Sequence, residues 1–215
     1  MKETKAGIPV RPQRTAVTHP EMPGPDPEPF AGKVREILAA LGEDPGREGL
    51  LKTPERVEKS LRFLTQGYWM TVEEVVGDAV FEEKHQSMIM VRDIELYSLC
   101  EHHLLPFVGV AHVGYLPGER ILGLSKLARV VELFARRPQV QERLTQQIAD
   151  WLHDQLAPRG VAVVVAAEHL CMTVRGVQAS GANTVTSALH GQLRDDAASR
   201  AEFFTLIAAH EKDSR

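Results

Sequence analysis

Apolar residues follow two different spacings along this chain, and the change from one to the other predicts the order of its elements. Apolar side chains three or four residues apart mark helices over residues 30–41 and 53–64, with Thr53 expected as the N-cap of the second. A short capped turn is expected over residues 71–76. Together these elements predict an N-terminal helical segment over residues 30–77.

Runs of strand type follow, rich in β-branched residues and separated by turn residues. Residues 88–99 and 107–116 predict two neighbouring strands, one on each side of the letters CEHH. Residues 161–167, VAVVVAA, form a continuous apolar run that predicts a buried strand, and a further strand is expected before the last helix. Neighbouring strands of this kind favour antiparallel pairing.

Helical spacing returns between these strands and again at the end of the chain. Residues 127–134 and 140–156 predict two helices, and Ser199 with Glu202 predicts a capping box for the final one. The mixed order predicts an α+β fold, an antiparallel sheet with packed helices, over residues 78–215.

Residues 1–29 differ from the rest of the chain in composition. They hold seven of the 13 prolines and few apolar residues, with neither helical nor strand spacing. Such a segment cannot bury enough apolar surface to offset the entropy of ordering it. We therefore expect a disordered, proline-rich tail.

Charge and cysteine content narrow the class of protein. The 25 basic and 29 acidic residues give a net charge of -4, so the totals suggest neither a nucleic-acid nor a membrane partner. No apolar run approaches the roughly 18 residues of a membrane span, and the N-terminus lacks the apolar core of a signal peptide. A cytoplasmic protein is expected. In a reducing compartment its two cysteines, Cys100 and Cys171, are more useful as thiols than as a disulfide.

The letters CEHH carry the first candidate chemistry. Cys100 and His103 have a C-x-x-H spacing that lets a thiolate and an imidazole bind one ion, and Cys171 follows the predicted buried strand. Two thiolates and an imidazole suit zinc. Structural zinc sites use four protein ligands, whereas catalytic sites use about three and leave a position for water. Zinc-assisted hydrolysis is the reaction class that this count favours.

Two further histidines are candidates for proton transfer. His102, next to His103, is expected to point away from the metal, and His169 shares a face with Cys171 if that segment is extended. Three alternatives stay open from the residues alone: a surface histidine pair beside an unrelated cysteine, a nucleophilic Cys100 with a histidine base, and a disulfide between Cys100 and Cys171.

A second candidate site lies at the predicted start of the helix over residues 127–134. Ser125, Lys126 and Arg129 would place a hydroxyl and two cations beside free backbone N–H groups, an arrangement that suits phosphate. No GxxxxGK[ST] loop occurs, so a nucleotide would bind without a P-loop. The alternative is an ordinary solvated helix face.

Four stretches together resemble the zinc-dependent type of GTP cyclohydrolase I: SLCEHH, GLSKLARVVELFARRPQVQERLTQQI, EHLCMTVRG and TVTSALHG. The resemblance runs from about residue 32 to 208. It implies the tunnelling fold (T-fold) and the hydrolysis of GTP to 7,8-dihydroneopterin triphosphate and formate, the first step of folate and pterin biosynthesis. It also implies a homo-oligomer, a toroidal decamer with active sites at subunit interfaces.

The resemblance assigns roles residue by residue. Cys100, His103 and Cys171 match the ligands of a Zn²⁺ ion whose water attacks C8 of guanine. His102 and His169 match the proton-transfer histidines, and the ribose rearrangement uses groups near Ser125. The positions that match substrate contacts are Glu142 and Gln141 at the guanine edge, and Lys126, Arg129, Arg175, Arg56 and Lys59 at the triphosphate and ribose.

Two rivals from other classes remain at this point. One is a protein in which zinc only holds a partner-binding fold together, which a fourth protein ligand would support. The other is a tunnelling-fold relative with different chemistry, in which Cys100 acts as a nucleophile. His103, Cys171 and the intact QERL stretch argue against the second rival.

Overall fold

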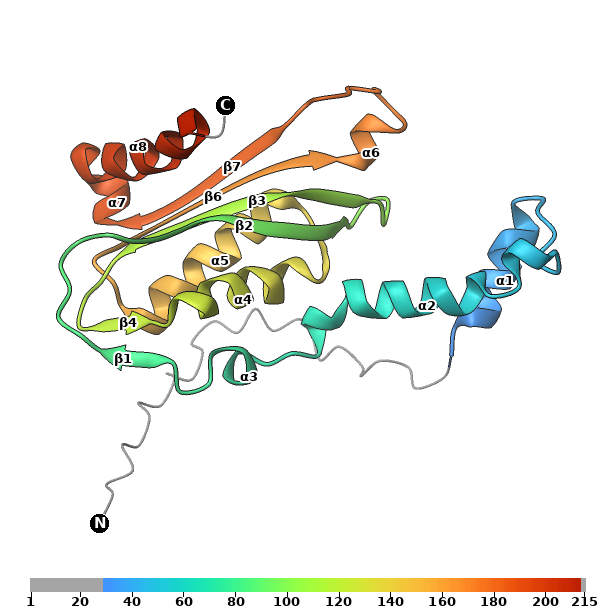
Figure 1. Cartoon of the computed structure of the whole chain (residues 1–215), viewed down its shortest axis with the longest axis horizontal. Helices are drawn as coiled ribbons and strands as arrows, with labels where there is room; N and C mark the ends of the chain where they lie inside the picture. The colour runs from blue at the N-terminus through green and yellow to red at the C-terminus, as the bar shows by residue number, and fades with distance from the viewer. Residues whose placement is uncertain (1–28, 214–215) are drawn as a thin grey trace, which may run out of the picture.

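The computed structural model describes residues 29–213 as a mainly antiparallel five-stranded sheet with helices on both faces, a small two-stranded sheet beside it and a helical arm at the N-terminal end (Figure 1). The α+β prediction is therefore confirmed. All but the last residue of the predicted tail, residues 1–29, lies outside the described part of the chain. Within residues 29–213, no helix combines the length and apolar character needed to cross a membrane.

The N-terminal helices extend away from the sheet. We call α1 and α2 the arm, since α2 projects from the body and carries α1 at its far end (Figure 1). The prediction of Thr53 as an N-cap is wrong by one position, because Lys52 holds the cap position without a side-chain bond. The elements are α1 (Ala31–Ala40), η1 (Glu48–Leu50), α2 (Thr53–Leu64), η2 (Gln66–Tyr68) and α3 (Val72–Val76).

The capped turn expected at residues 71–76 is confirmed as α3. The Thr71 hydroxyl accepts a bond from the Glu74 backbone N–H at 3.2 Å, and the Glu74 carboxylate accepts one from the Thr71 N–H at 2.8 Å. This reciprocal capping box satisfies two backbone donors at the start of a helix only five residues long.

The main sheet has the strand order β5-β2-β3-β6-β7, and all pairs are antiparallel except β5 with β2. Strands β2 and β3 are the two predicted neighbours, and the turn between them carries CEHH. A separate pair, β1 (Val80–Glu82) and β4 (Arg120–Leu122), lies beside the sheet. The main strands are β2 (Ile89–Cys100), β3 (Pro106–Leu116), β5 (Pro138–Gln139), β6 (Gly160–His169) and β7 (Thr184–Gly191).

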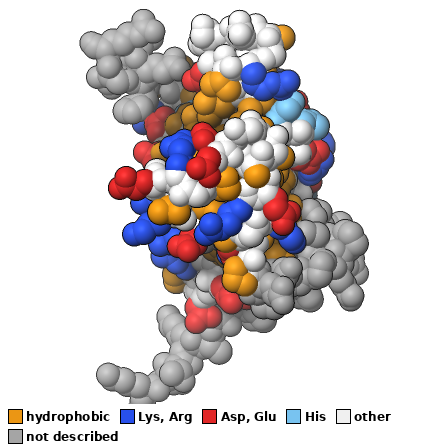
Figure 2. Space-filling model, turned by 90° about the vertical axis from the view of Figure 1, so that its right-hand side faces the viewer, with side chains coloured by type: hydrophobic (Ala, Val, Ile, Leu, Met, Phe, Trp, Pro, Cys, Tyr) orange, Lys and Arg blue, Asp and Glu red, His pale blue; other side chains and the backbone are white. Residues whose placement is uncertain are grey.

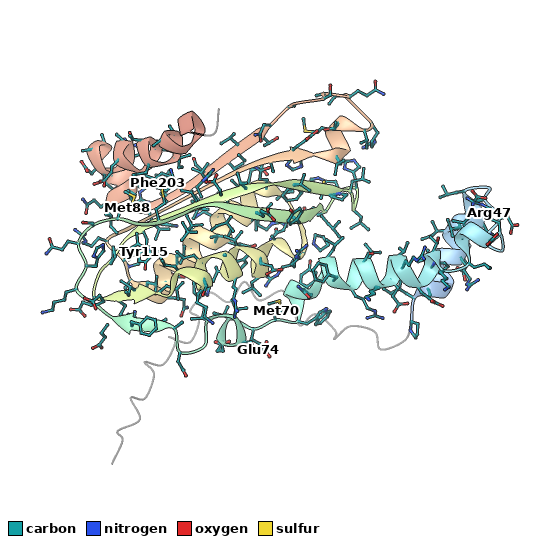
Figure 3. All side chains as sticks on the ribbon, in the orientation of Figure 1. Arg47, Met70, Glu74, Met88, Tyr115 and Phe203 are labelled. Atoms are coloured by element: carbon teal, nitrogen blue, oxygen red, sulfur yellow. The ribbon has the colours of Figure 1, made fainter. Side chains whose placement is uncertain are left out.

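Helices cover the two faces unequally. The long helices α4 (Leu124–Ala135) and α5 (Gln141–Leu156) bury one face and form most of the core, which includes the fully buried ring of Tyr115 (Figures 1 and 3). On the other face, Phe203 packs with Met88 in a smaller cluster (Figure 3). The helices after β6 are α6 (Leu170–Thr173), α7 (Gln192–Asp195) and α8 (Ala197–Asp213).

The last helix begins earlier than its predicted capping box. Helix α8 starts at Ala197, so Ser199 lies in its first turn and is not the cap. The Asp196 carboxylate takes that role, since it accepts bonds from the Ser199 backbone N–H at 2.8 Å and from the Ser199 hydroxyl at 2.6 Å. Sequence spacing alone had favoured the serine, because both residue types are good N-caps.

Candidate metal centre and active site

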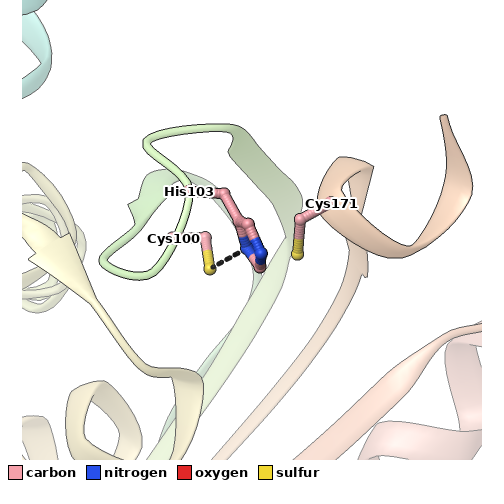
Figure 4. A group of neighbouring side chains, drawn as sticks. All are labelled: Cys100, His103 and Cys171. Carbon is pink, nitrogen blue, oxygen red and sulfur yellow. Dashed lines mark hydrogen bonds between the residues drawn. The ribbon is translucent and has the colours of Figure 1, made fainter. Parts of the chain in front are cut away.

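The sheet brings Cys100, His103 and Cys171 together at one end of the molecule (Figure 4). Cys100 ends β2, His103 lies in the following turn, and Cys171 lies in α6 directly after β6. One ligand atom from each lies within 4.8 Å of the others. Strands β2 and β6 both pair with β3, so their ends meet although the two cysteines are far apart in sequence.

The spacing of these atoms fits a tetrahedral zinc site. Cys100 Sγ and His103 Nδ1 are 3.7 Å apart, close to the roughly 3.6 Å that tetrahedral Zn–S and Zn–N bonds would give. Among residues 29–213, the group able to hold a metal has three members and no fourth protein ligand. That count fits a catalytic site better than a structural one.

The two thiols form no disulfide, and two thiolates at these positions would repel each other. Both cysteines are free, which sets aside the disulfide alternative. Burial and the adjacent Cys100 thiol raise the pKa of Cys171, while the charge of Arg175 opposes that shift. A cation between the two sulfurs would favour both thiolates, because a coordinating thiol loses its proton. The donor set therefore suits a soft divalent metal.

Backbone bonds and one ion pair hold the CEHH turn in place. The Cys100 N–H donates to Leu105 O and the Leu104 N–H donates to Cys100 O, both at 2.8 Å, so the hairpin closes around the ligands. Glu101 forms two bonds with Arg143 on α5, at 2.5 and 3.2 Å. These bonds lower the pKa of the Glu101 carboxyl. The sequence left Glu101 without a role, and this pair ties the turn to α5.

The neighbouring histidines differ in what they reach. His102 Nδ1 also approaches Cys100 Sγ, at 3.8 Å, yet His102 is outside the three-residue group, and its ring lies at 72° to that of His103. The side chain of His102 is 63% exposed. Figure 2 views this end of the molecule and shows histidine side chains at the surface. The His102 side chain is therefore accessible to a substrate without a conformational change.

Two side chains hold the ring of His169. The expectation that His169 and Cys171 share one face of an extended segment is wrong, because β6 ends at His169 and α6 begins at the next residue. The imidazole stacks on Phe107, with ring centroids 4.5 Å apart and planes at 8°, and its Nε2 lies 2.7 Å from Gln141 Oε1. Burial lowers the pKa of His169, and the charge of Glu142 opposes that shift.

The predicted guanine readers occupy different environments. Glu142 is exposed in the first turn of α5, where its charge acts on His169. Gln141 is buried, at 1% exposure, and its amide is engaged within the core. Glu142 is thus free to meet a ligand in this structure, whereas Gln141 is not.

The residues predicted to bind phosphate at the start of α4 lie at the other end of the sheet. Ser125 and Lys126 are in the first turn of α4, which follows β4; there the Leu122 N–H donates to the Tyr115 hydroxyl. Tyr115 pairs with Ile89, at the opposite end of the 12-residue β2 from Cys100. Those strand ends are about 35 Å apart at the usual rise per residue. One chain therefore does not bring the start of α4 to its own metal centre.

The predicted cations are distributed over four places. Lys126 Nζ donates to Val75 O at 3.0 Å, and Arg129 lines a groove with Tyr97 and other residues of β2 and α4. Arg175 is exposed close enough to Cys171 for its charge to act on the thiol. Arg56 and Lys59 are exposed on α2, and so lie on the projecting arm. Of these cations, Arg175 is the one whose charge acts on a cysteine of the metal group.

Sequence reasoning missed two residues of this site, Phe107 and Arg143. It also missed the contact between the Gln141 side chain and His169. Phe107 stands in an ordinary strand pattern, so only its register opposite His169 reveals the stacking. Arg143 lies 42 residues after Glu101 in the chain, so no local sequence signal pairs the two.

Comparison with known proteins gives a consistent result. The family model described as GTP cyclohydrolase I matches residues 30–208. A protein named GTP cyclohydrolase 1 from Dictyostelium discoideum is 58% identical over 178 residues, 83% of this chain and 77% of its own. The proteins of that name from Deinococcus radiodurans and Homo sapiens are 52% and 54% identical, covering 90% and 83% of this chain and 91% and 71% of their own.

A weaker likeness links the chain to a solved structure. The apo form of an archaeosine synthase QueF-like protein superposes with a TM-score of 0.43 and 18% sequence identity, covering 50% of this chain and 97% of that one. A likeness of this size adds nothing to the argument from the family.

Proposed function

This chain belongs to the GTP cyclohydrolase I family, and from that premise we propose that it hydrolyses GTP to 7,8-dihydroneopterin triphosphate and formate. The observation that carries the proposal is the group of Cys100, His103 and Cys171, with the imidazole of His102 3.8 Å from Cys100 Sγ. The reaction is the entry step to folate and other pterins. A cytoplasmic location, where both thiols stay reduced, belongs to the same proposal.

We assign zinc to the three-residue group. A zinc ion bound there would lower the pKa of a coordinated water to about 7 and so supply a nucleophile at neutral pH. His102 and His169 are the groups that move protons as the imidazole ring of guanine opens and formate leaves. His102 Nδ1 lies 3.8 Å from Cys100 Sγ and His169 lies two residues before Cys171, yet neither belongs to the three-residue group, which suits proton transfer more than ligation.

Glu142 is the residue we assign to guanine. Its exposed carboxylate can accept bonds from the ring N–H and the exocyclic amine of guanine, while adenine would leave these polar groups unpaired. Its charge already acts on His169, so a base held by Glu142 would lie beside that imidazole. The buried Gln141 side chain contacts the His169 imidazole.

We assign the triphosphate and ribose to Ser125, Lys126 and Arg129 of a second copy of the chain, together with Arg175. The separation of α4 from the metal centre within one chain supports a shared site, because GTP is much shorter than the length of β2. Arg56 and Lys59 on the arm are weaker candidates for the same contacts.

A ring of subunits would provide that second copy. Within residues 29–213, strand β7 has one partner, β6, and β5 pairs with β2 only at Leu99 and Cys100, so β7 and most of the outward edge of β2 carry unpaired backbone groups. Such strand edges are templates for pairing with another chain. We propose a homo-oligomer closed through these edges, a toroidal decamer with active sites at the subunit interfaces, in keeping with the tunnelling fold.

The activity is tested directly with purified protein. The protein is incubated with GTP, the products are oxidised, and pterin fluorescence and formate are measured together, with ATP as the matched substrate control. We expect equal amounts of pterin and formate from GTP, loss of both after chelation, and recovery when Zn²⁺ is restored. Formate release that persists in metal-free protein would refute the zinc assignment, and absence of formate would refute the activity.

A further inference from the structure

Gln141 sits at the centre of a hydrogen-bond network that leaves it nothing to offer a substrate. Its Nε2 lies 3.0 Å from Val165 O, 2.9 Å from Thr184 O and 3.2 Å from Thr186 Oγ1. Its Oε1 lies 2.7 Å from His169 Nε2. The residue is 1% exposed. To contact a base, the amide would have to abandon buried partners, each at a cost of about 1–3 kcal/mol.

The chemistry of these partners fixes the orientation of the amide. Val165 O and Thr184 O are backbone carbonyls, which can only accept hydrogen bonds. The end of the Gln141 side chain that faces them must therefore be the NH₂ group. The other end, which faces His169, must be the carbonyl oxygen.

The orientation of the amide in turn fixes the state of the imidazole. A side-chain carbonyl oxygen can only accept, so the His169 nitrogen 2.7 Å away must carry a hydrogen. We propose that Gln141 is a positioning residue that holds His169 with its proton on Nε2 and leaves Nδ1 as the ring nitrogen available to the substrate. The proposal rests on the function proposed above.

The hydroxyl groups of Thr145 and Thr186 each have one possible donor and acceptor assignment in this network. The Thr145 hydroxyl donates to the Gln141 backbone oxygen at 2.8 Å, so it accepts from the Thr186 hydroxyl at 2.6 Å. Thr186 Oγ1 then keeps its lone pairs for the Gln141 amide at 3.2 Å. Every hydroxyl proton of the network is thereby assigned, and none competes for the carbonyl oxygen that holds His169.

Phe107 supplies the second constraint on the same ring. It lies opposite His169 in the β3–β6 register and stacks on it almost in parallel, which fixes the plane of the imidazole. The amide contact then fixes the rotation within that plane. When Nδ1 takes a proton from the reacting purine, the Nε2–H bond to the amide oxygen becomes charge-assisted and stronger. The ring needs no reorientation for this transfer.

Neutron diffraction from deuterium-exchanged crystals tests the proposal without any variant and without turnover. At a pH where His169 is neutral, we expect deuterium on Nε2 of His169 and none on Nδ1, and the Gln141 amide deuterium atoms directed at Val165 O and Thr184 O. Deuterium on Nδ1 with none on Nε2 would overturn it. This result does not depend on whether the protein hydrolyses GTP, so the two proposals fail separately.

Kinetics of Gln141→Leu distinguish positioning from base recognition. We expect kcat to fall by about 10²-fold, with KM for GTP and zinc content nearly unchanged. A large rise in KM at unchanged kcat would overturn the proposal in favour of a guanine contact. Gln147→Leu is the matched control, since Gln147 is also a buried α5 glutamine, whose side-chain partner within residues 29–213 is Gln139 and not His169; it should keep both constants. If Gln141→Leu does not fold, the neutron result decides.

Discussion

At the scale of single residues, the CEHH turn shows how four adjacent side chains acquire separate tasks. Cys100 and His103 belong to the metal group, His102 reaches the same sulfur from outside it, and Glu101 anchors the turn to Arg143. Because the hairpin bonds fix the backbone, each side chain keeps its own direction. A substitution at one of these positions should therefore affect one task.

Cys171→Ser tests the third ligand. A neutral hydroxyl is a far poorer zinc ligand than a thiolate, so the variant should lose bound zinc and lose turnover by more than about 100-fold. Metal content and formate release measured on the same sample check this. Normal turnover in a zinc-free sample would show that the metal is not catalytic.

His102→Ala tests proton transfer by a residue outside the metal group. We expect zinc to stay at the wild-type level while kcat falls by about 10²–10⁴-fold, the usual contribution of a general acid or base. Loss of zinc in this variant would instead identify His102 as a ligand. His85→Ala is a suitable control, because His85 is exposed in the segment between β1 and β2, away from the CEHH turn.

At the scale of elements, sequence patterns predicted the main helices and strands and the capped start of α3, but not the starts of α2 and α8. Thr53 and Ser199 were both expected as caps, whereas Lys52 and Asp196 occupy those positions. At α8, two good cap residues stand three positions apart, and the structure uses Asp196 and not Ser199. At α2, Lys52 occupies the cap position without a side-chain bond.

The Asp196 cap should give α8 a pH-dependent stability. Bonds from Ser199 lower the pKa of Asp196 below its usual 3.8 in the folded protein. A lowered folded-state pKa means that the stabilisation is fully present above pH 3.8 and is lost as the pH falls through the folded-state value. Asp196→Ala should therefore lower the protection of α8 amides at neutral pH, with little difference from wild type in strong acid.

Hydrogen exchange of α8 at several pH values checks this prediction. Asp195→Ala is the control, since Asp195 is equally exposed but pairs with Arg194 and caps nothing at α8. A loss of protection in Asp196→Ala that is the same at every pH would contradict the role assigned to the carboxylate charge.

At the scale of the whole molecule, one chain places the two groups of proposed site residues at opposite ends of its sheet. The metal group and Glu142 lie at one end, and Ser125 and Lys126 lie beside the other. If one complete site takes one group from each of two subunits, two variants that each lack a different group should regain activity when they assemble together. This expectation separates a shared site from a site complete within one chain.

Complementation between Cys171→Ser and Lys126→Ala tests the shared site. Each variant alone should be inactive, whereas co-assembly of equal amounts should restore about one quarter of the sites, those that draw an intact half from each of two subunits. Formate release from co-expressed subunits, compared with the two variants mixed after assembly, is the measurement. No recovery in a proven mixed assembly would argue for a site within one chain.

The sequence by itself determined the local features of this protein: the helical and strand segments, the C-x-x-H pair and the motifs of its family. These depend on residues close together in the chain, where spacing alone limits the geometry. Only the tertiary structure decided that Phe107 and Gln141 fix His169, and that Ser125 lies far from Cys100. Such relations depend on strand register and helix packing, which the buried core as a whole selects and no single stretch of sequence specifies.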